Sequence, residues 1–104
     1  MQHIGTELNQ VNTGVLLERS KVNFASIANI LYRVKDFKQR YPQLSEIDPY
    51  GDTIFTIYQV PPAIEELEKL KQETRASEVI NEIQDTIEFL RKVEQNTFAK
   101  FIGD

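Results

Sequence analysis

The sequence predicts an all-α protein, a compact bundle of three main helices plus short helices. Apolar residues recur at the three- and four-residue spacing of an amphipathic helix within residues 22–41, 61–74 and 77–90. Short connections favour antiparallel packing of such helices. The alternative is an α+β fold with a short N-terminal hairpin or strand. Residues 13–21 suit either a strand or a helical turn, and FTIY (55–58) alternates like a strand.

The length and composition indicate one domain, residues 1–104. A chain of 104 residues with 40% hydrophobic and 27% charged residues is typical of a globular protein with one core. Residues 1–14 are polar and lack a period, so they are predicted to be a loose arm or an edge element. No apolar run approaches the roughly 20 residues of a bilayer span, and no basic-then-apolar signal opens the chain. We therefore expect a cytoplasmic protein.

The first predicted helix begins near Val22, where Asn23 or Ser20 suits the cap, and ends before Pro42. Its wide apolar stripe places it at the centre of the bundle; the stripe comprises Phe24, Ile27, Ile30, Leu31, Val34, Phe37 and Tyr41.

The second and third predicted helices follow the two prolines. The second starts at Pro61, since proline suits a first helical turn, and runs to about Thr74. Ser77 then caps the third, whose stripe is Ile80, Ile83, Ile87 and Leu90. The final segment, NTFAKFIGD, is expected to form a last helical turn or a tucked tail, stopped by Gly103.

The stretch EIDPYGDTIFTIYQVPP (46–62) predicts a corner between helices. Asp48, Pro49 and Gly51 suit the first, second and fourth positions of a β-turn. Asp52 or Thr56 then starts the next helical piece, and Thr56 with Gln59 has the form of a capping box. A calcium loop is disfavoured because the alternating Asp/Asn ligands of such loops are missing.

No catalytic constellation is found in the sequence. There is one histidine, His3, and no cysteine, which excludes thiolate chemistry, disulfides and Cys-ligated metals. Phosphate-binding glycine loops and the HExxH motif are absent as well. We therefore expect neither enzyme activity nor a cofactor or metal site.

Charge is polarised along the chain. Residues 1–45 carry six basic and three acidic side chains, whereas residues 46–104 carry six basic and thirteen acidic ones. A protein of net charge −4 repels phosphates, so nucleic acid is a poor partner, and without an apolar span no membrane partner is expected either. The field favours encounter with a basic protein instead.

Two motifs, IDPYGDTIF (47–55) and the final FIGD (101–104), resemble those of a family of small uncharacterised bacterial proteins. That family has a central DPYGDT-hydrophobic-Phe motif and a FIGD-type ending. The resemblance covers residues 46–104 and implies a domain with a fixed turn, without an assigned activity. In size and acidity the chain is also similar in type to immunity proteins of contact-dependent inhibition systems, which cover the active site of a toxin nuclease.

The sequence thus predicts a binding protein that neutralises a basic partner, in the manner of an immunity protein. The residues expected to contact the partner are Asp48, Tyr50, Asp52, Glu65, Glu68, Glu82 and Asp85, with Tyr50 as an aromatic anchor. The alternative is a homo-oligomerising structural or regulatory protein that associates through the Ile80–Leu90 seam.

Overall fold

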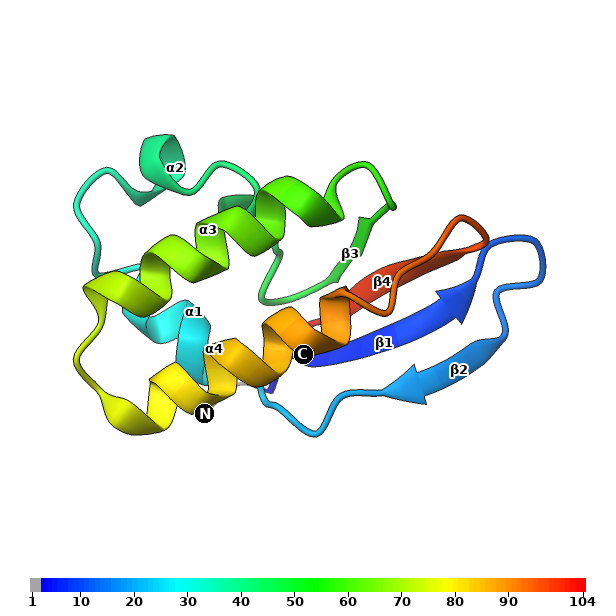
Figure 1. Cartoon of the computed structure of the whole chain (residues 1–104), viewed down its shortest axis with the longest axis horizontal. Helices are drawn as coiled ribbons and strands as arrows, with labels where there is room; N and C mark the ends of the chain where they lie inside the picture. The colour runs from blue at the N-terminus through cyan, green and yellow to red at the C-terminus, as the bar shows by residue number, and fades with distance from the viewer. Residues whose placement is uncertain (1–2) are drawn as a thin grey trace.

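The computed structural model describes residues 3–104 and shows an α+β fold, so the prediction of an all-α bundle is wrong. Four antiparallel strands form one sheet, and the helices α1, α3 and α4 cover one of its faces (Figure 1). No helix of residues 3–104 lies over the opposite face of the sheet. The alternative in the sequence analysis, α+β with an N-terminal hairpin, matches this architecture.

The sheet comprises β1 (Gly5–Gln10), β2 (Leu16–Arg19), β3 (Asp52–Phe55) and β4 (Thr97–Ile102), in the order β2-β1-β4-β3. β1 and β4 are central and pair along their whole length, from Gly5 opposite Ile102 to Gln10 opposite Thr97. β2 and β3 are the edges. The two ends of the described chain therefore lie side by side in the middle of the fold.

β4 corrects the expectation that NTFAKFIGD is a helical turn or a tail. Ala99 and Phe101 alternate with Phe98, Lys100 and Ile102, and only the first two are fully buried. This period of two places Phe101 in the core under the helices and its neighbours on the open face.

β1 corrects the interpretation of residues 1–14 as a loose arm. Residues 5–10 form a central strand, with Thr6, Leu8 and Asn9 buried; residues 1–2 lie outside the described part of the chain. One large apolar side chain in six residues gives little alternation to detect. The strand is stabilised by the ladders on both sides, not by its own hydrophobicity.

The first predicted helix is shorter than expected. α1 (Ala25–Leu31) is followed by turns and by α2 (Phe37–Arg40), and Asp36 between them has a left-handed backbone, with φ of 59°. A left-handed residue cannot continue an α-helix, so the apolar stripe of residues 22–41 is divided between two helices. The Asn23 carboxamide accepts hydrogen bonds from the Ile4 and Ala25 amides, which ties this helix start to β1.

The other two predicted helices are confirmed within one residue. α3 spans Val60–Glu73 with both prolines in its first turn, and α4 spans Ser77–Leu90, with Ser77 inside the helix and not at its cap. Ile83, Ile87 and Leu90 are fully buried against the rest of the chain. Three of the four residues of the Ile80–Leu90 seam are therefore part of the protein's own core, and Ile80 is half-buried.

Phe101 is the aromatic centre of the core. Its ring makes edge-to-face contacts with Phe24 at 5.0 Å and with Phe55 at 5.5 Å between centroids. These three rings join α1, β3 and β4, and all are buried. Such pairs add about 0.5–1.5 kcal/mol each beyond their area.

The end of β4 passes very close to the 48–51 turn. Gly103 donates its amide to the Gly51 carbonyl at 2.8 Å, and Asp104 donates to the Pro49 carbonyl at 3.1 Å. A Cβ on residue 103 would lie 2.7 Å from the Asp48 carbonyl oxygen and closer still to the Pro49 carbonyl. Glycine is required here for close backbone approach, a different reason from the helix stop that the sequence suggested.

We expect Gly103→Ala to destabilise the protein by about 1–3 kcal/mol, because the added methyl group meets rigid backbone. Gly5→Ala is the matched control, since a Cβ there lies at an ordinary 3.6 Å from the His3 ring. Urea unfolding followed by circular dichroism measures both. Equal midpoints for the two variants would contradict the close approach.

The carboxylate of a glutamate in α3 fixes the start of the short 3₁₀ helix η1 (Leu44–Glu46). Glu66 of α3 accepts hydrogen bonds from the Gln43 amide at 3.0 Å and the Leu44 amide at 2.9 Å. These amides have no backbone acceptor within the 3₁₀ turn, so the Glu66 carboxylate serves as their acceptor.

We predict that Glu66→Ala lowers the free energy of unfolding by about 1–2 kcal/mol, since two amides lose a charged acceptor. The side chain of its neighbour Glu65 is exposed, and its carboxylate forms no hydrogen bond within residues 3–104, so Glu65→Ala is expected to change stability little. Chemical denaturation of the two variants tests this; a loss as large in Glu65→Ala would refute it.

Candidate functional site

The 48–52 turn is held by a dense set of hydrogen bonds. Its own closing bond runs from the Gly51 amide to the Asp48 carbonyl at 3.4 Å, as the predicted β-turn requires. The Asp48 carboxylate accepts the Tyr50 amide at 2.9 Å, and the Asp48 amide donates to the Thr53 hydroxyl at 2.9 Å. With the two bonds from residues 103 and 104, the backbone of the turn is bonded on both sides. Asp52 begins β3, not a helical piece.

Tyr50 stands out from this fixed backbone, with 74% of its surface exposed. Tyr32, 39% exposed, lies near it and packs its ring 5.3 Å from that of Phe37. Partial burial raises the pKa of Tyr32, and the nearby Asp48 carboxylate and Tyr50 raise it further. Tyr32, Phe37, Asp48 and Tyr50 thus form one aromatic and acidic surface, which we call the corner surface together with Asp52 and Asp104.

Negative charge on the corner surface is only partly compensated. Asp52 forms an ion pair with Lys100 at 3.4 Å. Asp48 and Asp104 form no ion pair with any base in residues 3–104, although the Asp104 carboxylate accepts the His3 amide at 3.1 Å. Two carboxylates therefore remain available beside an exposed tyrosine.

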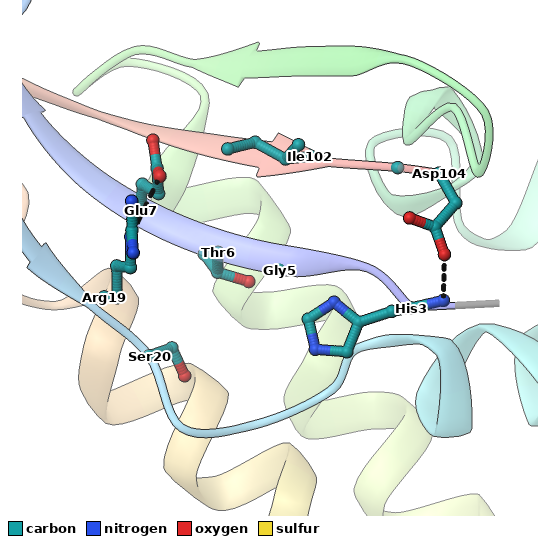
Figure 2. A pocket seen from close by; sticks show the side chains of 9 residues that line it. His3, Gly5, Thr6, Glu7, Arg19, Ser20, Ile102 and Asp104 are labelled. Atoms are coloured by element: carbon teal, nitrogen blue, oxygen red, sulfur yellow. Dashed lines mark hydrogen bonds and ion pairs between the residues drawn. The ribbon is translucent and has the colours of Figure 1, made fainter.

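A cavity of about 260 Å³ lies next to the corner surface, on the open face of the sheet. Figure 2 shows its walls: Glu7 with Arg19 at one end, His3 with Asp104 at the other, and the strands behind. Glu7 and Arg19 pair at 3.3 Å. Gly5 and Gly103 contribute no side chains, which leaves the hollow open. Gly103 and Asp104 line this cavity and also bond to the turn, so cavity and corner surface are continuous.

The other expected contact residues lie elsewhere. Glu65 and Glu68 are on α3, and Glu82 and Asp85 are on α4. Glu68 pairs with Lys71 at 3.0 Å and lies 3.8 Å from Arg91, so its charge is compensated within the chain. The structure therefore brings Asp48, Tyr50 and Asp52 together and does not join the four helix acids to them.

The sequence analysis missed Tyr32, Asp104 and the cavity. Tyr32 lies off the apolar stripe of the predicted helix and is the C-terminal cap of α1, close enough to Asp48 and Tyr50 for both to raise its pKa. The repeated aspartates of DPYGD and FIGD were the available signal, since the two motifs prove to be neighbours in space.

A second missed cluster is structural. The buried Tyr41 donates its hydroxyl to Glu73, which also accepts a hydrogen bond from Arg40, so α3 is tied to the end of α2. Burial and this hydrogen bond raise the pKa of Tyr41, and the bonds from Tyr41 and Arg40 lower the pKa of Glu73. Tyr41 has no exposed surface, so these shifted pKa values do not mark a reactive site.

Three further findings bear on function. Within residues 3–104, no group of three or more His, Asp or Glu side chains is placed to hold a metal ion, and no helix is long and apolar enough to cross a bilayer. Comparison with protein families, curated proteins and solved structures finds no match to this chain. The resemblance carried by DPYGDT and FIGD stays an expectation.

The Glu73 cluster predicts a pH dependence of stability. Because the pKa of Glu73 is lowered on folding, its contribution is present above its ordinary value of 4.5 and is lost as pH falls through the folded value. Glu73→Gln should therefore be less stable than the wild type near neutral pH and should lose less stability on acidification. Denaturation at a series of pH values checks this; parallel curves for the two proteins would contradict it.

Proposed function

We propose that this protein is a non-catalytic binding protein that neutralises a basic protein partner, and that the corner surface is the contact. The single observation that carries the proposal is Tyr50, an aromatic side chain 74% exposed on a turn bonded to β4. Tyrosine is enriched among interface anchors, and Tyr50 lies beside the Asp48 carboxylate, which forms no ion pair in residues 3–104, on a turn held by hydrogen bonds.

Preorganisation supports this proposal. Binding costs free energy when a loop must be ordered, and a turn that is already fixed avoids most of that cost. Asp48 accepts the Tyr50 amide and is itself anchored to Thr53, so the anchor and the carboxylate beside it have one relative position. The turn therefore has the properties of a recognition loop.

Charge supports a basic partner. Asp48 and Asp104 lack a compensating base in the described residues, and the whole chain carries −4. Carboxylates around a central aromatic pair with lysine and arginine, which are also the side chains with which proteins contact nucleic-acid phosphates. The field also steers association, with rate constants up to about 10⁸–10⁹ M⁻¹s⁻¹ at low salt.

The finer proposal is an immunity protein that covers the active site of a toxin nuclease in the cytoplasm. The small acidic domain and its exposed anchor fit this class. Glu65, Glu82 and Asp85 would then act as a second, outer ring of acids that guides approach, without direct contact at the corner surface. Glu68 is the weakest member because it already pairs with Lys71.

Tyr50→Ala should weaken the complex with the basic partner at least about tenfold, since it removes the anchor and leaves the turn intact. The matched control is Tyr58→Ala. Tyr58 is even more exposed, at 87%, and follows β3 at the end opposite the 48–52 turn. Binding of the purified pair is measured by calorimetry after co-expression with the product of the neighbouring gene.

Salt provides the second readout. Raising ionic strength should slow association of the wild-type pair, and Asp48→Asn should reduce that salt dependence because one uncompensated carboxylate is gone. Equal losses for Tyr50→Ala and Tyr58→Ala, or an association rate that ignores salt, would contradict the assignment to the corner surface.

A further inference from the structure

We propose that the cavity on the open face of the sheet receives one arginine side chain, which, if the proposed function holds, belongs to the basic partner. Its volume of about 260 Å³ is below the roughly 300–1,000 Å³ of pockets that hold whole drug-sized ligands, so it suits a single side chain. Gly103 and Asp104 line this cavity and also bond to the 48–51 turn, so an occupant lies beside the corner surface.

The Thr6 hydroxyl is the group in the cavity that indicates a ligand. Thr6 is only 3% exposed, lines the cavity, and forms no side-chain hydrogen bond within residues 3–104. Figure 2 shows its oxygen turned toward the space between Ser20 and His3. A buried hydroxyl without a partner costs free energy, and a donor that enters the cavity supplies the missing hydrogen bond.

The charge of the cavity selects a cation. Glu7 and Arg19 pair at one end at 3.3 Å and compensate each other. At the other end, one oxygen of the Asp104 carboxylate accepts the His3 amide at 3.1 Å, and the carboxylate forms no ion pair with any base in residues 3–104. The Asp104 charge is therefore left over, and the chain's net charge of −4 also attracts a cationic group.

The spacing of the acceptors favours a guanidinium over an ammonium group. The second Asp104 oxygen, the Thr6 hydroxyl and the Ser20 hydroxyl come from three separate segments of the chain. The Ser20 hydroxyl accepts the Val22 amide at 3.1 Å and keeps a second lone pair. A guanidinium directs five N–H donors outward in one plane and can reach separated acceptors together, whereas an ammonium concentrates three donors at one point.

Titration with a free arginine derivative tests the proposal without the partner. N-acetyl-L-arginine amide should bind the whole chain in the millimolar range and shift the NMR resonances of the Gly5, Ser20 and Gly103 amides, which belong to residues that line the cavity. N-acetyl-L-citrulline amide has the same shape with a neutral urea group, so it should bind at least about tenfold more weakly.

Two variants assign the contacts. Asp104→Asn should weaken binding of the arginine derivative at least about tenfold, because the uncompensated carboxylate is gone. Its matched control is Glu78→Gln, which removes an exposed acid in the first turn of α4. Thr6→Val should weaken binding about threefold or more without lowering stability, because the hydroxyl has no partner to lose. Its control is Thr56→Val, at an exposed position outside the cavity.

Three results would overturn the proposal: no shift of the cavity amides, equal binding of the arginine and citrulline derivatives, or unchanged binding in Asp104→Asn. The cavity would then hold water only. Such a failure is distinct from failure of the proposed function, because Tyr50 is not among the residues that line the cavity and Tyr50→Ala is tested on the partner complex. Selective arginine binding that is lost in Asp104→Asn supports the cavity assignment even if the corner surface is rejected.

Discussion

The passage of Gly103 past the 48–51 turn is the constraint on which the rest of the structure depends. It requires two segments fifty residues apart to approach at backbone distance, which only glycine permits. The same approach aligns β3 on β4, from Asp52 opposite Ile102 to Phe55 opposite Ala99. That register places Phe55 and Phe101 on the helix side, where they contact each other. The core and the corner surface are thus fixed by one contact.

This constraint also connects stability to the proposed function. The hydrogen bonds that hold the turn are made to residues 103 and 104, and Asp104 is at the same time one of the uncompensated carboxylates. Tyr50 contributes almost nothing to the core, being mostly exposed, whereas its backbone is bonded to Asp48. The frame and the anchor are therefore separable: the frame is required for folding, and the anchor is free to serve recognition.

The sequence was sufficient where the signal is local. α3 and α4 follow from apolar spacing and from prolines at a helix start, and the 48–51 turn follows from Asp, Pro and Gly in order. The sequence was insufficient for the strands, because their formation depends on pairing with distant segments of the chain. β1 has few apolar residues, and its ladder partner β4 is about ninety residues away, so neither strand shows a strong pattern alone. The apolar stripe of residues 22–41 does mark helical segments, but it cannot show that Asp36 adopts a left-handed backbone conformation that ends one helix before the next.

Amide hydrogen exchange in the free protein at neutral pH tests the central claim, that the corner surface is preorganised by the end of β4. The account predicts that the Gly103, Asp104 and Tyr50 amides are protected at least about 100-fold over an unstructured chain. Gly103 should be protected nearly as well as the amides within β4, because its acceptor, the Gly51 carbonyl, belongs to the same rigid frame. Exchange of these three amides at unstructured rates, with the β4 amides still protected, would contradict it.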